Sequence, residues 1–168
     1  MKKPVIIFAT LLLAACSGSS SSMNTTKAAL PPEPDRAASN AVLAGIDTDN
    51  DGVRDDVQRL VLRSYTSTTK RALALSFAKE VRKIYSEPPT TPTQARAITD
   101  AKSRVSGCIY SHREIPFEAR AGIIETIVSA HTDTAARMKE YLNYNRLLHG
   151  QTIESRSDEP GICEGVLK

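Results

Sequence analysis

Aromatic side chains are scarce in this sequence. It has no tryptophan, and its 168 residues include five tyrosines and three phenylalanines. Proteins that bind single-stranded nucleic acid stack the bases on aromatic rings, and this chain has few rings to offer. Its formal charge of +3 falls to +1 when Lys2 and Lys3 are left out, because 20 basic residues then stand against 19 acidic ones. We therefore expect no nucleic-acid partner.

The sequence also lacks the motifs that mark common catalytic centres. It contains no G-x-S-x-G, no H-E-x-x-H and no glycine-rich phosphate loop. The histidines His112, His131 and His149 are far apart in the chain. His131 and His149 have adequate structural roles, at the edge of an apolar face and in a last helical turn. We expect a protein that is not an enzyme, and a cryptic enzyme is the least favoured alternative.

The apolar run from Val5 to Leu13 is too short to span a bilayer as a stable helix. It follows the positive start Met1-Lys2-Lys3, which is typical of a secretion signal, here expected at residues 1–15. The next residues, Leu13-Ala14-Ala15-Cys16, resemble the lipobox of bacterial lipoproteins. The resemblance implies that Cys16 is lipidated and anchors the mature chain in a membrane. Ser17 favours the outer membrane, with the domain facing the periplasm or the cell surface.

Residues 16–36 are rich in serine, threonine and proline. A segment of this composition buries too little apolar surface to fold, so we expect a disordered tether. About twenty such residues have a root-mean-square reach of roughly 25 Å, which would hold a domain clear of the lipid headgroups. The remaining residues, 37–168, have the length of a single domain.

Five carboxylates fall within the ten residues from Asp47 to Asp56, and they repel one another unless a cation gathers them. Ca²⁺ takes about six to eight oxygen ligands, and alternate residues of a tightly turned loop can converge on one such ion. The run resembles the D-x-D-x-D-G-x-x-D signature shared by EF-hand-like loops and thrombospondin type 3 repeats. We expect a calcium-binding loop at residues 47–58. The expected ligands are Asp47, Asp49, Asp51, the carbonyl of Val53, Asp55 and Gln58.

Two positions depart from these signatures. Gln58 stands where an EF-hand has a bidentate glutamate, and Arg54 stands where paired EF-hands usually have an apolar residue. No second D-x-D-x-D-G run occurs in the sequence. We therefore expect a single weak site, with a dissociation constant of roughly 10⁻⁴ to 10⁻³ M or above. The alternative is a solvated turn in which Asp55 or Asp56 caps the following helix.

Helical periodicity accounts for most of the chain after this loop. The apolar stripes predict five helices. The first follows the loop, with apolar residues from 57 to 65 on one face, the second covers about 69–86, and the fourth covers about 117–131. The third is capped within Thr90-Thr91-Pro92-Thr93 and has apolar residues from 98 to 108 on one face, and the fifth runs from caps in Thr132-Asp133-Thr134 to Gly150. Gly107 should weaken the end of the third helix, and Gly150 should end the fifth. No long window alternates with a period of two. We predict an all-α domain, a small bundle of about five antiparallel helices joined by short loops.

With Cys16 assigned to lipid, Cys108 and Cys163 are the remaining cysteines. An oxidising compartment favours a disulfide between them. It would join the irregular tail to the third helix and contribute about 4 kcal/mol in the chain-entropy account. A reactive thiol pair or a soft-metal site is the alternative, which is disfavoured because the sequence has no short C-x-x-C spacing and no neighbouring histidine.

The first two predicted helices are strongly basic. Between residues 57 and 86, seven basic residues stand against Glu80 alone, a net charge of +6, whereas residues 47–56 carry −4. The seven are Arg59, Arg63, Lys70, Arg71, Lys79, Arg82 and Lys83. Each cation near an anionic lipid surface contributes about 1 kcal/mol to binding. This helical hairpin is therefore a candidate for holding anionic headgroups, lipopolysaccharide or an acidic partner, and its plainer interpretation is a solvated face.

The combination of features resembles a family of small, uncharacterised exported lipoproteins of Gram-negative bacteria. The shared features are the lipobox, the segment Leu30-Pro31-Pro32-Glu33-Pro34, the run from Gly45 through the loop to Arg59, and the late helix with Tyr141-Leu142-Asn143-Tyr144-Asn145. The resemblance implies a compartment and an ion but no activity. We expect a calcium-stabilised envelope lipoprotein that acts as a structural or interaction module with an envelope protein. An envelope binding protein for an anionic component is the alternative.

Overall fold

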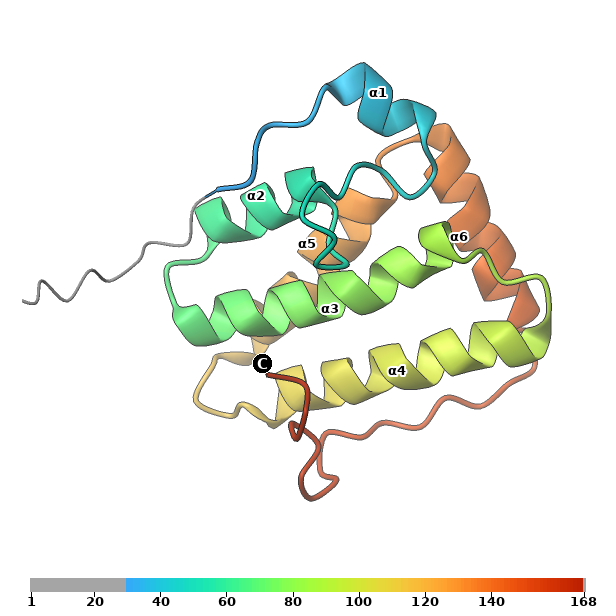
Figure 1. Ribbon diagram of the computed structural model, residues 1–168. Coiled ribbons are helices and arrows are strands. Elements are labelled where there is room, and N and C mark those ends of the chain that lie inside the picture. The colour runs from blue at the N-terminus through green and yellow to red at the C-terminus, as the bar shows by residue number, and fades with distance from the viewer. Residues whose placement is uncertain (1–29, 168) are drawn as a thin grey trace, which may run out of the picture.

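The protein is all-helical in the computed structural model, which describes residues 30–167 (Figure 1). The predicted fold class is confirmed. The helices are α1 (Arg36–Ala41), α2 (Asp55–Ser64), α3 (Thr68–Ser86), α4 (Pro92–Ser111), α5 (Phe117–His131) and α6 (Ala135–Leu147). The predicted signal peptide and the predicted lipidation site, Cys16, lie outside the described residues.

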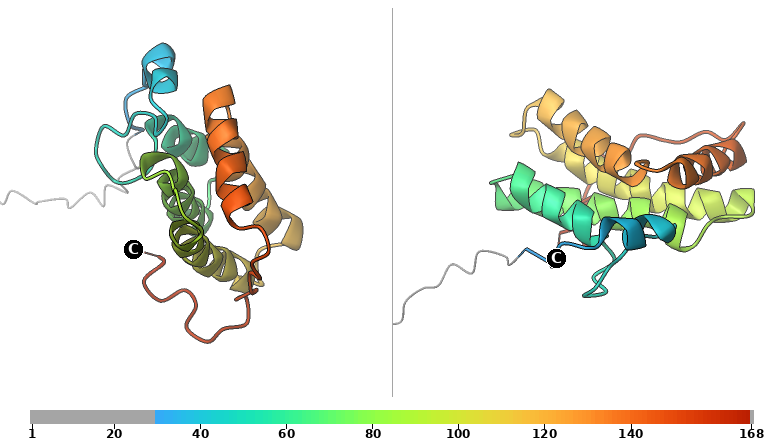
Figure 2. Two further views of the ribbon diagram at one scale, coloured as in Figure 1. Left: turned by 90° about the vertical axis from the view of Figure 1, so that its right-hand side faces the viewer. Right: turned by 90° about the horizontal axis from the view of Figure 1, so that it is seen from above.

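Helix α3 occupies the centre of the bundle and packs against α2, α4, α5 and α6 (Figures 1 and 2). Its buried residues recur at intervals of three and four, which places them on one broad apolar stripe. They are Leu73, Ala74, Phe77, Ala78, Val81, Ile84 and Tyr85. The stripe predicted for this helix is therefore confirmed. No helix within residues 30–167 combines the length and the apolar character needed to cross a membrane.

Side-chain caps define the starts of four helices, one of which is α1, where Asp35 accepts a hydrogen bond from the backbone N–H of Ala38. Ser67 accepts a hydrogen bond from the backbone N–H of Lys70 at the start of α3, and Thr134 does the same for Arg137 in α6. At the start of α4, Thr91 and Gln94 form a reciprocal capping box. Each cap pairs a backbone N–H that has no partner within the helix. These local signals explain why the predicted starts agree with the structure.

The structure corrects the predicted helices in three places. The described chain has six helices rather than about five, because α1 is too short to show periodicity. Helix α4 continues past Gly107 to Ser111, so this glycine does not end it. Helix α6 ends at Leu147, and Gly150 adopts its positive φ of 76° in the turn that follows.

The end of the predicted tether lies against the domain. Pro31 is buried, and its carbonyl accepts a hydrogen bond from Arg59 Nη1 at 2.5 Å. Arg59 Nη2 also pairs with Glu33 at 2.6 Å. The packed part of the chain therefore begins at about residue 31, a few residues before the predicted boundary at 37.

The C-terminal tail runs back along α4 after α6 (Figure 1). The predicted disulfide between Cys108 and Cys163 is present, with the two Cα atoms 4.9 Å apart. Ser76 of α3 donates a hydrogen bond to the carbonyl of Val166 at 2.8 Å. The tail passes so close to Gly107 that a Cβ there would lie 3.0 Å from the backbone of Arg156. Gly107 thus serves the packing of the tail.

One premise about the cysteines was wrong, because a histidine does lie beside them. His112 Nε2 is 3.9 Å from Cys163 Sγ, and His112 Nδ1 is 2.6 Å from Glu114 Oε1. His112 follows α4 directly, whereas Cys163 lies about fifty residues later, so only the fold brings them together. While the disulfide is intact, these two thiol groups are not available as metal ligands.

Replacing both Cys108 and Cys163 by alanine should lower the free energy of unfolding by about 4 kcal/mol or less, because the unfolded chain regains a long loop. Urea unfolding would measure the loss, and hydrogen exchange should rise in residues 149–167 before it rises in α3. A reducing agent should reproduce the effect in the parent protein and leave the double variant unchanged. Equal stability of the two proteins would contradict this prediction.

Candidate metal site

The Asp-rich loop is closed by the residue that begins α2. Asp55 is fully buried, and its two carboxylate oxygens accept hydrogen bonds from the backbone N–H and the hydroxyl of Thr48, at 3.0 and 2.6 Å. The backbone N–H of Asp55 donates to the carbonyl of Ile46 at 2.9 Å. The loop is therefore a defined ring of residues, fixed to the N-terminus of a helix.

Two residues of the loop adopt left-handed backbone conformations, Asn50 with φ of 56° and Gly52 with φ of 90°. A side chain at Gly52 would also lie within 2.9 Å of Lys79 Cε. Glycine is thus required there for its conformation and for the close approach of α3. The following residue, Val53, is buried in the core and anchors the loop.

Three predicted ligands gather at one point of this loop. Asp47, Asp49 and Asp55 each offer one carboxylate oxygen, and these atoms all lie within 4.8 Å of one another. Ligands that share a Ca²⁺ ion at about 2.3–2.6 Å are separated by at most about 5 Å. The spacing is therefore that of a group able to share one cation. Asp49 is exposed, so the group opens to solvent.

Asp51 lies outside this group of three and holds the turn instead. Its Oδ1 accepts a hydrogen bond from the backbone N–H of Val53 at 2.7 Å, and its Oδ2 accepts one from Gln58 Nε2 at 3.0 Å. Burial raises the pKa of Asp51, and the charges of Asp49 and Asp47 add to this effect, although the bond from Val53 opposes it. The loop thus carries more negative charge than its own hydrogen bonds stabilise.

Two oxygens of predicted ligands are buried without a hydrogen-bond donor among the described residues. They are Asp47 Oδ1 and Gln58 Oε1. The side chain of Asp47 is only 5 % exposed, and its other oxygen accepts from the backbone N–H of Gly52 at 3.1 Å. A buried carboxylate oxygen without a positive partner or donor is costly. A cation at the loop would supply that partner.

Helix α3 supplies two positive charges to the loop. Arg82 Nη1 lies 3.2 Å from Asp47 Oδ2, and Lys79 Nζ donates to the carbonyl of Asp51 at 2.9 Å. Both residues were predicted to face an anionic partner. Their contacts attach the loop to the central helix and neutralise part of its charge.

Most of the other basic residues of the predicted hairpin also contact groups of the protein itself. Arg59 and Arg63 pair with Glu33, and Lys83 pairs with Glu80. Arg71 donates to the carbonyls of Leu62 and Tyr65 at the end of α2. Lys70 lies in the first turn of α3. Most basic side chains of the hairpin therefore make internal contacts, and they do not form a free basic face.

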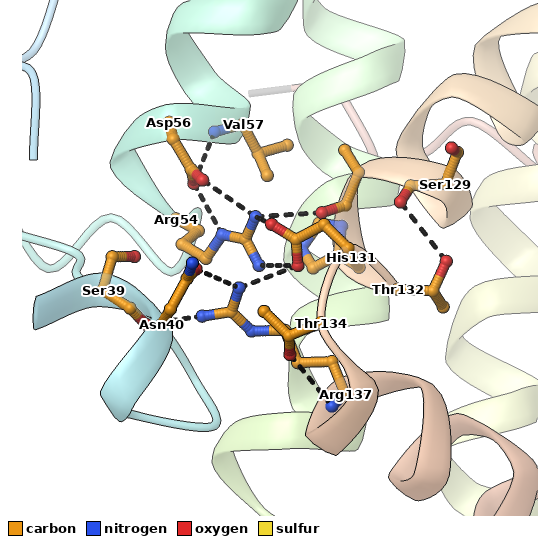
Figure 3. A network of polar contacts seen from close by, with 12 residues as sticks. Ser39, Asn40, Arg54, Asp56, Val57, Ser129, His131, Thr132, Thr134 and Arg137 are labelled. Carbon is orange, nitrogen blue, oxygen red and sulfur yellow. Dashed lines mark hydrogen bonds and ion pairs between the residues drawn. The ribbon is translucent and has the colours of Figure 1, made fainter. Parts of the chain in front are cut away.

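The sequence singled out Arg54 of the loop as a departure from the EF-hand pattern, but it did not show that this arginine is buried and paired. Arg54 is 2 % exposed, and its guanidinium pairs with Asp56 at 2.5 Å and with Asp133 at 2.9 Å (Figure 3). It also donates to the carbonyl of Ala130 at 2.9 Å. Arg54 thus joins the start of α2 to the end of α5. An apolar residue at this loop position makes no such contacts.

A second buried arginine holds α1 in place. Arg137 is 1 % exposed and lies beside Ser39 of α1, to whose carbonyl it donates at 2.6 Å (Figure 3). It also donates to the carbonyls of Val42 and Leu43, at 3.1 and 3.0 Å. It also pairs with Asp133 at 2.8 Å. The i, i+4 spacing of Asp133 and Arg137 is visible in the sequence, but their contact with residues almost a hundred positions earlier is not.

His131 lies beside this pair, where it is 1 % exposed and stacks on Tyr85 with ring centroids 5.9 Å apart. Burial lowers the pKa of His131 to about 4, so the ring is neutral at pH 7. Its Nδ1–H donates to the carbonyl of Ile127 at 2.9 Å. The predicted structural role of this histidine therefore agrees with its surroundings.

Comparison of the chain with protein-family models, with curated proteins and with solved structures gave no match.

Replacing Arg137 by methionine should lower the free energy of unfolding by about 3 kcal/mol or more, because it removes one of the two arginine partners of Asp133 and the donor to three carbonyls of the α1 segment. Urea unfolding would measure the change. Arg113→Met is a suitable control, since Arg113 is exposed and pairs only with the exposed Asp158. Its cost should stay below about 1 kcal/mol. Similar costs for the two variants would refute the special role of the buried Arg137.

Proposed function

We propose that this protein is a calcium-binding module of the cell envelope, in which one ion stabilises the loop of residues 47–58 against α2 and α3. The buried, donor-free Oδ1 of Asp47 is the observation that carries the proposal. It belongs to a residue of the carboxylate group that comes within 4.8 Å, together with Asp49 and Asp55. Hard oxygen donors of this kind suit Ca²⁺ rather than softer metals.

The buried Oε1 of Gln58 supports the same assignment. Gln58 stands at the twelfth position of the loop, where an EF-hand ligand is expected, and its amide oxygen has no donor within the described range. A neutral amide is a weaker ligand than a bidentate carboxylate. The nearby Arg82 also competes for Asp47. Both features favour weak binding, of the order of 10⁻⁴ to 10⁻³ M, as in extracellular calcium modules.

The ion would act as a structural element rather than as a reagent. Residues of the group lie at the beginning of the loop and at the first turn of α2, so a shared cation would hold these two parts together. Asp47 and Asp51 are in turn joined to α3 through Arg82 and Lys79. Calcium would thereby stiffen the surface formed by the loop and α3, which an envelope partner could recognise.

The rival interpretation is a turn whose charges are neutralised only by Lys79 and Arg82. It explains the exposed carboxylates but leaves Asp47 Oδ1 without a partner. The alternative function, an anionic ligand held by the basic hairpin, is disfavoured because six of its seven basic side chains contact other groups of the protein.

Calcium should raise the thermal stability of the purified protein. With a dissociation constant of about 10⁻⁴ M and calcium at about 10 mM, the gain in unfolding free energy is roughly 2.7 kcal/mol. Asp49→Asn should weaken calcium binding about tenfold or more, because it removes one carboxylate from the group of three. It should leave the calcium-free melting temperature nearly unchanged, since Asp49 is exposed. Calorimetry with and without calcium would measure both quantities.

Gln58→Glu should strengthen calcium binding, because a carboxylate replaces an amide at the last ligand position. Asp158→Asn, an exposed position in the tail, should leave the calcium response intact. Asp55 is unsuitable for this test, since its two bonds to Thr48 maintain the loop itself. A melting temperature that is indifferent to millimolar calcium in the parent protein would overturn the proposal and favour the neutralised turn.

We further propose that lipidated Cys16 anchors the module in the outer membrane, as the lipobox resemblance implies. Cys16→Ser should leave the precursor without lipid, and its domain should no longer sediment with membranes. Cell fractionation followed by immunoblotting would show this. Continued fractionation of the variant with the outer membrane after a high-salt wash would count against a lipid anchor.

A further inference from the structure

A cavity of about 240 Å³ lies among α3, α4, α5 and α6, where it shares no residue with the Asp-rich loop. Its walls are mostly apolar. Tyr141 and Tyr144 contribute rings from α6, and the remaining apolar wall consists of Phe77, Ile124, Val128 and Leu148. Ile153 of the tail borders one side, where its side chain is 50 % exposed. A concave, apolar space with few polar groups is the usual form of a small-molecule site.

The one cationic side chain in this cavity is that of Lys102, on α4. Its Nζ lies 4.8 Å from the ring centroid of Tyr144 and 6.0 Å from that of Tyr141. It is also 3.4 Å from the hydroxyl of Tyr144, which in turn shares a 2.6 Å hydrogen bond with Thr99. The ammonium group is therefore held in a fixed position by aromatic faces and one hydroxyl.

The ammonium of Lys102 forms no salt bridge with any carboxylate of residues 30–167, and its described contacts are with Tyr144 and Tyr141. Burial lowers the pKa of Lys102 to about 8, so the amine is still mostly protonated at pH 7. A partly buried cation without an anion is unfavourable, and aromatic faces compensate only in part. An anion bound beside Lys102 would accept a charge-assisted hydrogen bond from its ammonium group.

We propose that this cavity binds a small apolar monocarboxylate, with its carboxylate on Lys102 and its hydrocarbon part between the rings of Tyr141 and Tyr144. A single ammonium matches a single negative charge, whereas phosphate sites usually provide several N–H donors or an arginine fork. The volume of the cavity corresponds to about eight water-sized groups. Ligands of the size of benzoate or hexanoate therefore fit within it.

Ser103 and Ser106 complete the polar side of the cavity. Both lie on α4 with Lys102, one and four residues after it, so their hydroxyls can reach a carboxylate near the ammonium. The wall contributed by α3 and α5 is apolar, and Asn145 of α6 is a further polar residue of the lining. The ammonium of Lys102 orients the ligand, because it is the cationic group of the lining and lies on α4. The inference is independent of calcium, since the cavity and the loop share no residue.

The test uses the purified parent protein and benzoate, with benzyl alcohol as the neutral analogue of similar shape. Titration followed by NMR should show shifts at the cavity residues with benzoate and a dissociation constant of about 1 mM or tighter. Benzyl alcohol should bind at least about tenfold more weakly, which corresponds to the loss of one charged hydrogen bond. Affinity for benzoate should fall as the pH rises through about 8, where Lys102 loses its proton.

Lys102→Met should weaken benzoate binding about tenfold or more, because methionine keeps the apolar stem and removes the charge. Lys139→Met is the matched control on α6, where Lys139 is exposed and outside the cavity, and it should leave binding unchanged. Equal affinity for benzyl alcohol and benzoate, or no response to about 10 mM benzoate or hexanoate, would overturn the inference in the parent protein itself.

Discussion

The structure depends most on the carboxylate of Asp133, which is shared by two buried arginines. Arg54 Nη2 and Arg137 Nη1 approach it at 2.9 and 2.8 Å. Although burial alone would raise the pKa of Asp133, the bond from Arg137 and the charge of Arg54 lower it, so it remains ionised. A buried guanidinium is tolerated only when it is well paired. Through Arg137 and Arg54, the carboxylate of Asp133 connects α1, the start of α2 and the junction of α5 with α6.

The position of the Asp-rich loop depends on the pairing of Arg54 with Asp133. Arg54, the residue before Asp55, is held by Asp56 and Asp133. Asp55 closes the loop through Thr48. Gly45 approaches so near to Arg54 that a Cβ would lie 2.1 Å from its Cδ, and its φ of 71° needs glycine as well. The chain before the loop is thus held as firmly as the chain after it. The loop is thus already ordered, which would lower the ordering cost of binding the proposed ion.

Helix α3 is common to both proposed sites, because it contributes Lys79 and Arg82 to the loop and Phe77 to the cavity. The two sites differ in chemistry. The loop gathers negative oxygens and has two positive neighbours, whereas the cavity holds one ammonium without a carboxylate. Each has a charge that the described residues do not fully balance, Asp47 in the first and Lys102 in the second.

The sequence by itself determined what depends on neighbours along the chain. These features are the all-α class, the stripe of α3, the caps at Thr91 and Thr134, and the spacing of the Asp-rich loop. The tertiary structure decided which charges meet. Nothing in local spacing shows that Asp51 bonds to Gln58 rather than joining the group of three, that His112 lies beside Cys163, or that Lys102 lacks a carboxylate. Periodicity reports which face of a helix is buried, but the partner of a charge is fixed by helices that are distant in the chain.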